Sequence, residues 1–333
     1  MGVKIKSLLE IDPIDFSDLK GKYITIDAAN ALYQFLAITQ PSTGLPLLDS
    51  KNRVTSHLSG IFYRTLRLIE KDIRPIYVFD GARPKLKGKT IEERKAVREN
   101  AHKEWVTAIE EGDLEKAKKF GPSAHRLTSE MIDDSKKLLV AMGIPIVEAP
   151  CEGEAQASFM VGKNEVWAVA TQDFDAVLFG APKIVRNLSL AQKYEPELII
   201  SSKNYQKLNI SREQFIDIGI LIGTDFNEGI KGIGAKTALK LIKENKDLKT
   251  VIKEKGFEFD RSEEELEEIR IFFNKPIVTE KYKVDFKTSN DNEIKRILID
   301  EHQFDPARVE KGIKRLKKGL SFKQQMNLEK WFK

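Results

Sequence analysis

Two acidic pairs in the middle of the chain have the composition and spacing of a metal site. Glu152 and Glu154 are separated by one glycine, and Asp173 and Asp175 follow from nineteen residues after Glu154. Each pair stands where a short apolar run ends. Carboxylates that lie close together repel one another, so a shared site needs divalent cations or raised pKa values. The two pairs therefore predict a cation site with oxygen ligands.

Three further acids end comparable apolar runs and enlarge the candidate site to seven carboxylates. They are Asp27 after residues 23–26, Asp80 after 76–79 and Asp225 after 221–224. Oxygen ligands favour Mg²⁺ or Mn²⁺, whereas Zn²⁺ more often recruits Cys or His, of which the chain has one and four. Any single acid at a strand end can equally cap the next helix or bound a turn. Seven such acids together favour the metal site.

Elements that would position these acids are visible in the hydrophobic pattern. Short β-branched runs at 23–27, 75–79, 144–148 and 166–170 alternate with stretches of helical periodicity. This alternation predicts an α/β fold with a mostly parallel central sheet flanked by helices. In an open parallel sheet, ligands bind outside the carboxyl ends of the strands, where most of the acids would lie.

An insertion separates the second and third of these runs by about sixty residues, far more than a crossover requires. Residues 89–119 have the composition of a charged helix, and a Gly-Pro break at 121–122 precedes a second helix predicted at 127–142. A charged insertion beside the acidic edge would form a lid or arch over the site. The alternative is an exposed helical hairpin with no function.

A glycine-rich turn follows a buried helix predicted at 214–222. Gly232 and Gly234 lie in it, flanked by Lys231 and Lys236, and a helix restarts directly afterwards. Glycines allow backbone N–H groups to approach a phosphate, with the positive N-terminus of the next helix behind them. We predict a DNA-backbone clamp here, although the same pattern occurs in simple tight turns.

Composition indicates a globular protein with basic segments around an acidic centre. Hydrophobic residues make up 41% and charged residues 32%, and no apolar run is long enough to span a bilayer. Residues 83–104 carry eight Lys/Arg against four Asp/Glu, and 311–333 carry eight against one, so the rest of the chain is net negative. This distribution suits a polyanion held near metal ions, or else solvated helix faces. The single Cys151 agrees with an intracellular protein that does not contact the membrane.

Together these segments resemble the flap endonucleases of the structure-specific 5′-nuclease superfamily, in particular the archaeal form, along nearly the whole chain. The matching motifs, in family order, are residues 1–3 (MGV), 26–28 (IDA), 33–36 (YQFL), 55–58 (TSHL), 77–81 (YVFDG), 142–145 (MGIP), 149–155 (APCEGEA) and 223–225 (GTD). The resemblance implies cleavage of branched DNA with a 5′ flap, 5′-3′ exonuclease activity, and a role in DNA replication and repair. It also implies a monomer, cytoplasmic if the source is archaeal.

The resemblance assigns roles residue by residue. All seven acids would hold two Mg²⁺ ions, replaceable by Mn²⁺, directly or through water. Lys87 and Arg94 match the catalytic basic pair at the base of the helical arch, where a spacing of seven would place both on one helix face. Tyr33 matches the aromatic residue that stacks on the terminal base. The glycine-rich turn matches the helix–two-turn–helix element, where K⁺ is expected.

The end of the chain matches the box that binds sliding clamps. Gln325 is followed by Leu328, Trp331 and Phe332 in the pattern Gln-x-x-aliphatic-x-x-aromatic-aromatic. In a short helical turn the three apolar side chains would form one plug, with Gln325 as a polar anchor. The alternative is a terminal helix whose aromatics pack on its own domain.

Two departures and several alternatives accompany the resemblance. Gln40 stands where relatives usually carry Arg, and Cys151 stands where Ser is usual. Beside an anionic cluster the thiolate form of Cys151 is disfavoured, so we expect a small buried side chain there.

The alternative functions are an exonuclease or a bubble or junction nuclease of the same superfamily, and a non-catalytic adaptor at DNA junctions. We expect regions at 1–98 and 99–255 (nuclease, the second with the arch and the helix–two-turn–helix), 256–322 (helical) and 323–333 (clamp-binding tail).

Overall fold

The computed structural model of the chain describes residues 2–38, 46–87, 103–104, 107–108, 111, 113, 115–116, 127–188 and 194–331, with side chains up to Ser321 and without that of Lys87. In this part of the chain, strands form one sheet in the order β1-β7-β6-β5-β2-β3-β4. They span Asp12–Pro13 (β1), Tyr23–Asp27 (β2), Arg74–Phe79 (β3), Ile146–Glu148 (β4), Ala168–Ala170 (β5), Lys183–Arg186 (β6) and Glu197–Ile200 (β7).

The sheet is parallel from β6 to β4, and β7 and β1 add an antiparallel edge. This confirms the α/β prediction with a mostly parallel sheet, and all four predicted strands are present with slightly shifted ends. The antiparallel edge was not predicted. Between β2 and β3, Asp27 pairs with Val78, and between β3 and β4, Phe79 pairs with Glu148. The carboxyl ends of these three strands are therefore level.

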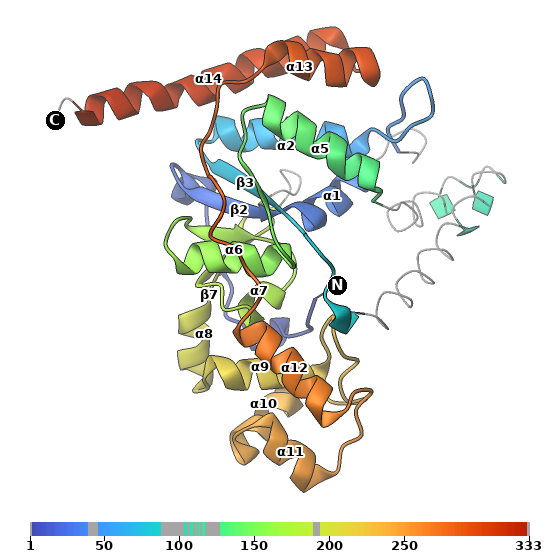
Figure 1. Cartoon of the computed structure of the whole chain (residues 1–333), viewed down its shortest axis with the longest axis vertical. Helices are drawn as coiled ribbons and strands as arrows, with labels where there is room; N and C mark the ends of the chain where they lie inside the picture. The colour runs from blue at the N-terminus through green and yellow to red at the C-terminus, as the bar shows by residue number, and fades with distance from the viewer. Residues whose placement is uncertain are drawn as a thin grey trace.

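Both faces of the sheet are covered by helices, because side chains alternate between two apolar clusters. On β3, Ile76 and Val78 join one cluster, while Tyr77 and Phe79 join the other. The Tyr77 face is covered by α1 (Ala28–Leu36), α2 (Ser56–Glu70), α5 (Ser129–Ala141), α13 (Asp291–Lys295) and α14 (Pro306–Trp331). Figure 1 shows α13 and α14 outermost on this side, above α2 and α5.

The opposite face is covered by α6 (Gly153–Gly162) and α7 (Asp175–Leu178), and a lobe of further helices continues from there (Figure 1). These helices are α8 (Ser201–Leu208), α9 (Arg212–Ile222), α10 (Ala235–Asn245), α11 (Leu248–Lys255) and α12 (Glu263–Asn274). Short 3₁₀ turns η1 (Lys6–Leu8), η2 (Phe16–Leu19) and η3 (Lys85–Lys87) and a π-helical turn η4 (Arg296–Glu301) complete the fold.

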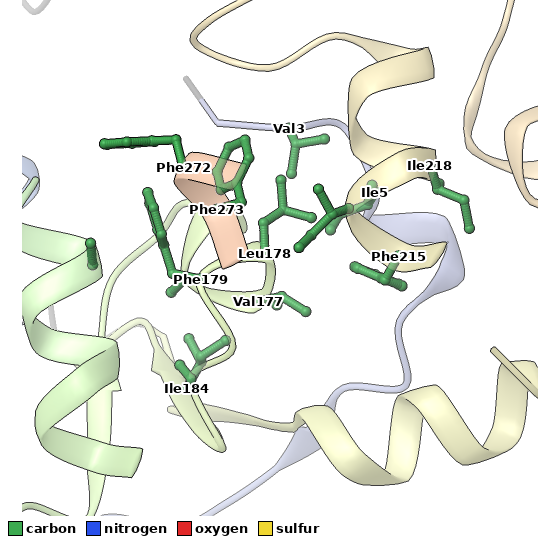
Figure 2. Packing of buried hydrophobic residues seen from close by; sticks show 14 of the residues in the cluster. Val3, Ile5, Val177, Leu178, Phe179, Ile184, Phe215, Ile218, Phe272 and Phe273 are labelled. Carbon is green, nitrogen blue, oxygen red and sulfur yellow. The ribbon is translucent and has the colours of Figure 1, made fainter. Parts of the chain in front are cut away.

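An aromatic core joins this lobe to the N-terminal segment. Figure 2 shows Val3 and Ile5 packed with Leu178 of α7, beside Phe215 of α9 and the Phe272–Phe273 pair of α12. The Phe179 and Phe273 ring centroids lie 4.9 Å apart. Buried aromatic pairs of this kind stabilise a packing beyond the area they bury. The core therefore fixes the N-terminal segment and α9 next to α7, where two of the candidate acids lie.

Capping explains where several of these helices begin. Ser211 and Gln214 form a reciprocal capping box at α9, and Ser262 and Glu265 form one at α12. Each box satisfies two backbone N–H groups that a helix start would leave without partners. The predicted helix at 127–142 is confirmed as α5, capped by Thr128. Most of 89–119, including the predicted arch helix, lies outside the described residues.

The structure bears on two expectations from composition, the lack of a membrane span and the burial of the single cysteine. Within the described residues, no helix is both long and apolar enough to cross a membrane. Cys151 is buried, as expected from its place beside the acidic pair.

Candidate active site

Four adjacent parallel strands, β5, β2, β3 and β4, deliver six of the seven acids to one edge of the sheet. Asp27 is the last residue of β2, Asp80 follows β3 directly, and Glu152 and Glu154 lie at the start of α6, after β4. Asp173 and Asp175 lie between β5 and the first turn of α7. Because these strands are parallel, their carboxyl ends meet at the same edge.

Asp225 reaches the same place from the lobe. It follows α9 in a turn that begins at Gly223, whose φ of +104° is a conformation that favours glycine. Its charge raises the pKa of Asp175, which places the two carboxylates within electrostatic reach. A helix end, rather than a strand end, therefore supplies the seventh acid. We call the seven residues the carboxylate site.

Mutual repulsion shows that the carboxylate site is one cluster. The charge of Asp27 is disfavoured by Asp80 and by Asp173. Glu154 is disfavoured by Asp27, Asp175 and Asp173. Together with the Asp175–Asp225 interaction, these electrostatic interactions link six of the predicted acids. Glu152 lies two residues before Glu154, at the N-cap position of α6.

Burial and repulsion shift the protonation of the most enclosed members. Burial, followed by the charges of Asp80 and Asp173, raises the pKa of Asp27 to about 8, although the N–H of Asn30 opposes the shift. Burial and then Asp225 raise the pKa of Asp175 to about 7, against the N–H of Val3. The pKa of Glu154 is raised well above its ordinary value, chiefly by burial. Like charges held together without compensation are typical of functional sites rather than of structural ones.

Backbone amides of the N-terminal segment hold two of the acids in place. The N–H of Gly2 donates to Asp173 Oδ1 at 3.0 Å, and the N–H of Val3 donates to Asp175 Oδ1 at 2.8 Å. A Cβ on Gly2 would lie 2.8 Å from Asp175 Oδ1, closer than carbon and oxygen normally approach. Glycine is therefore required at this position by the nearness of the acids.

A similar close approach fixes Asp80. The N–H of Gly153, the first residue of α6, donates to Asp80 Oδ1 at 2.7 Å, and a Cβ there would lie 2.9 Å from the same oxygen. The glycine between Glu152 and Glu154 thus lets the α6 N-terminus approach a neighbouring carboxylate. Asp27 also caps a helix, because its Oδ1 accepts the N–H of Asn30 at 3.1 Å at the start of α1.

Sequence reasoning missed the neutral residues that hold the acids. Thr171 donates its hydroxyl to Glu154 Oε1 at 2.6 Å and accepts the N–H of Asp173 at 3.2 Å. Asn30 donates to Asp173 Oδ2 at 3.1 Å. Their only signal in the sequence is position: Thr171 stands two residues before an acidic pair, and Asn30 stands three residues after a helix-capping acid.

The donor set suits a hard divalent cation. All seven side chains offer oxygen, and a bound cation would compensate the repulsion that raises their pKa values. Among the residues that the structure describes, no three His, Cys, Asp or Glu side chains form a preformed ligand group by themselves. Ions that keep several of their waters, as Mg²⁺ does, suit a cluster whose carboxylates are not gathered around one point. Metal ligation by these acids stays a prediction.

Several other predicted residues are placed on the surface. Tyr33 lies on α1 with 37% of its surface exposed. Lys231, Gly232, Gly234 and Lys236 are all exposed in and after the turn between α9 and α10, and Gly232 has a φ of +85° with no atom near its missing Cβ. The turn is therefore accessible, and its role as a DNA-backbone clamp stays a prediction.

The remaining predicted residues are only partly described. Lys87 ends η3, whereas Arg94 lies outside the described residues, so their placement on one helix face stays a prediction. Gln325, Leu328 and Trp331 belong to the last turns of α14, whose side chains there are not described. Phe332 and Gln40 lie outside the described residues.

Comparisons with known proteins identify the family. Residues 1–101 match the XPG N-terminal domain, and residues 143–225 match the XPG I-region. Flap endonuclease 1 of Pyrococcus furiosus is 44% identical, over 100% of this chain and of that protein. The chain belongs to the flap endonuclease family. The two matched regions of this family member contain all seven carboxylates.

Solved structures agree with this assignment. Flap endonuclease-1 from Methanococcus jannaschii superposes with a TM-score of 0.79 at 43% identity, covering 97% of this chain and 100% of that one. The catalytic core of Rad2, solved in complex with DNA substrate, shares the fold with a TM-score of 0.69 at 23% identity, covering 94% of this chain and 97% of that one. The flap endonuclease fold is thus present along nearly the whole chain.

Proposed function

We propose that this protein is a structure-specific 5′ flap endonuclease with 5′-3′ exonuclease activity, acting on branched DNA in replication, including Okazaki fragment maturation, and in repair. The observation that carries the proposal is the network of six mutually repelling carboxylates at the carboxyl edge of the sheet. It occurs in a chain that is 44% identical to flap endonuclease 1 of Pyrococcus furiosus over its full length. The product would carry a 5′-phosphate.

The carboxylate site would hold two Mg²⁺ ions, with Mn²⁺ as a substitute. When bound, such ions supply a hydroxide nucleophile near neutral pH and stabilise the charge on the attacked phosphate. The protein's own part is positioning: Gly2, Val3 and Gly153 hold carboxylate oxygens through backbone N–H groups, and Thr171 holds Glu154. This arrangement keeps the acids close despite their repulsion.

Basic and aromatic residues around the site would contact the DNA. Lys87 and Arg94 would place positive charge where the transition state gains negative charge, and losing either should lower the single-turnover rate by about 10²-fold with little change in affinity. Tyr33, exposed on the helix that Asp27 caps, would stack on the terminal base at the branch point. If variants of Lys87 and Arg94 bound flap DNA poorly but cut the bound DNA at the normal rate, the two residues would be substrate anchors instead.

The exposed turn between α9 and α10 would grip the duplex backbone without reading bases. Gly232 and Gly234 leave its backbone accessible, and Lys231 and Lys236 add charge. Backbone contacts of this kind give affinity and register but no sequence specificity. A K⁺ ion at this helix–two-turn–helix element is part of the proposal.

Two alternatives make different predictions on the same substrates. An exonuclease or junction nuclease of the superfamily would prefer nicked, bubble or four-way substrates. A non-catalytic adaptor would bind DNA and cut nothing, but an inert protein has no need to assemble mutually repelling acids. Full-length identity of 44% to a flap endonuclease, against 23% to the Rad2 core, favours the flap enzyme.

A substrate panel tests the proposal. Full-length protein would be incubated with end-labelled 5′-flap, nicked, bubble and four-way DNA, with Mg²⁺ or with EDTA. We expect Mg²⁺-dependent cleavage at the flap base that exceeds cleavage of the other substrates. Preferred cutting of the bubble or four-way DNA, or no cutting at all, would reject it.

The C-terminal tail would bind a sliding clamp, and the protein would otherwise act as a monomer. The helix α14 continues to Trp331, so the tail is helical at the position of the predicted apolar plug. Docking on a ring that already encircles DNA would raise the local concentration of the nuclease. The double variant Trp331→Ala/Phe332→Ala should lose clamp binding in calorimetry and keep clamp-independent cleavage, and unchanged clamp affinity would refute the assignment.

A further inference from the structure

The Asn30 side chain on helix α1 makes three hydrogen bonds, one of which reaches an acid of the carboxylate site. Its Nδ2 lies 3.1 Å from Asp173 Oδ2, and its Oδ1 lies 2.5 Å from Gln34 Nε2 and 3.4 Å from the backbone N of Gln172. Asn30 and Gln34 are four residues apart on α1, so their side chains meet on one face of the helix. Both side chains are half-buried.

The chemistry of the partners fixes the orientation of the Asn30 amide. An ionised carboxylate can only accept, so the group that faces Asp173 must be the NH₂ of Asn30. A backbone N–H can only donate, so the Oδ1 of Asn30 must face Gln172 and therefore accepts from Gln34 as well. The flipped amide would lose the bonds to Asp173 and to Gln172. The orientation of the Asn30 amide is thus determined by its hydrogen-bond partners.

Asp173 consequently has a donor on each carboxylate oxygen. Gly2 N–H donates to Oδ1 at 3.0 Å, and Asn30 donates to Oδ2 at 3.1 Å. Both donors are neutral, so they restrict the carboxylate plane without cancelling the charge that a cation would need. A lysine or arginine in the same place would compete with that cation.

We propose that Asn30 is a positioning residue for divalent-cation binding, which orients Asp173, and that Gln34 supports it by holding its amide. This inference rests on the proposed function, because it assigns a cation to the carboxylate site. Gln34 donates to Asn30 Oδ1 at 2.5 Å and so holds the amide that faces Asp173. Groups that orient a ligand in this way commonly change metal affinity by 10- to 100-fold when removed.

The test measures Mn²⁺ binding to the full-length protein without DNA, by isothermal titration calorimetry. Asn30→Leu keeps the branched shape of the side chain but removes its donor and acceptor, and should weaken Mn²⁺ binding about tenfold. Gln34→Leu should weaken it less, about threefold by the same principle. The double variant should match Asn30→Leu alone, because Gln34 has nothing left to orient. Asn292→Leu, exposed on α13, is the matched control and should bind as wild type.

Cleavage provides the second readout. In single-turnover reactions with flap DNA, Asn30→Leu should raise the half-saturating Mg²⁺ concentration about tenfold, while the rate at saturating Mg²⁺ stays within about threefold of wild type. Circular dichroism melting would verify folding, and Asn30→Ala replaces the leucine variant if that one does not fold. Wild-type Mn²⁺ affinity in the Asn30 variant, or additive effects in the double variant, would overturn the inference.

The outcomes separate this inference from the proposed function. If wild-type protein binds Mn²⁺ but leaves flaps uncut, the proposed function fails while the calorimetry still tests Asn30. If wild-type protein binds no Mn²⁺, the cation assignment fails and the inference is overturned with it. Flap cleavage by wild type with unaltered Mn²⁺ binding in the Asn30 variant would reject the inference alone.

Discussion

Buried acids occur in two regions of this protein, with opposite surroundings. In the lobe, the fully buried side chain of Asp217 accepts from Arg270 Nε at 2.7 Å and from the N–H of Leu248 at 3.2 Å, which joins α9, α12 and α11. In the carboxylate site, none of Asp27, Glu154 and Asp175 forms an ion pair with a Lys or Arg of the described chain. Instead these acids face one another.

The difference separates a stabilising role from a functional one. Burial raises the pKa of Asp217, and the Arg270 guanidinium opposes that shift, so the pair is internally compensated. Asp27, Glu154 and Asp175 have no Lys or Arg partner in the described part of the chain, so their charge is available to a ligand. Removing an acid should therefore have opposite consequences for stability in the two regions, and the following experiments test this contrast.

The largest effect is expected from Asp175→Asn. Loss of this carboxylate should lower the single-turnover flap-cleavage rate by about 10³-fold or more, equivalent to about 4 kcal/mol in the barrier. DNA binding should persist, because the proposed backbone contacts lie elsewhere. The free energy of unfolding without metal should stay level or rise, since a repulsion is removed. Wild-type turnover would reject the assignment of Asp175.

Breaking the Asp217–Arg270 pair should have the opposite profile. Arg270→Met leaves a buried carboxylate without its cation, and should lower the free energy of unfolding by about 3 kcal/mol in urea denaturation. Folded protein should cut flaps at a rate within about threefold of wild type. Asp217→Asn removes the charge and keeps the shape, so it should lower the free energy of unfolding by less than Arg270→Met does. Equal losses in the two variants would argue against the role of charge burial.

A third kind of buried titratable group sharpens the contrast. His57 on α2 is 2% exposed, and neither ring nitrogen has a hydrogen-bond partner among the described residues. Burial, with a smaller contribution from His302 and against Asp134, lowers its pKa to about 4. His57 therefore takes up a proton near pH 6.5 in the unfolded chain but only near pH 4 in the folded chain. The contribution of neutral His57 to the free energy of unfolding is complete above pH 6.5 and is lost as the pH falls toward 4.

The expected size of this loss is about 3 kcal/mol. His57→Leu should remove that part of the pH dependence, which urea denaturation at pH 7, 6, 5 and 4 would measure as a difference from wild type. A difference between the two proteins that stays constant with pH would show that His57 does not titrate as its burial implies.

The smallest effect is expected from two glycines of one helix. Gly153→Ala places a Cβ 2.9 Å from Asp80 Oδ1, so that carboxylate must move, and the flap-cleavage rate should fall about tenfold. Gly162→Ala in the same helix meets no atom within 4 Å. It should leave the rate unchanged and add about 0.5–1 kcal/mol of stability. Equal rates in both variants would show that Asp80 tolerates the displacement.

Much of the fold was predictable because its signals are local. Runs such as 75–79 are β-branched and apolar on both faces, as a strand buried between two helical layers must be, and α5 carries its own cap and its own stop. The antiparallel edge was not predictable in this way, because β1 has two residues and pairs with β7 almost two hundred positions away. Such short segments owe their extended form to their partners.

The acids of the carboxylate site were also predictable, since they stand at or near the ends of apolar runs and their types suit a hard cation. Their neutral supports were not. Asn30 and Thr171 look like ordinary polar residues near helix and strand ends, and Gly2 looks like any residue at a chain start. Their importance depends on hydrogen bonds to residues distant in sequence, such as the bond between Gly2 and Asp173.

The sequence by itself determined the chemistry: which carboxylates are present, that they stand at element ends, and that oxygen ligands suit Mg²⁺. Tertiary structure alone decided that they meet. Parallel pairing brings four strand ends to one edge, and the aromatic core of Figure 2 fixes α9 and the N-terminal segment beside them. The physical reason is that repulsion among carboxylates acts through space, so their raised pKa values arise only after packing has excluded water and brought distant segments together.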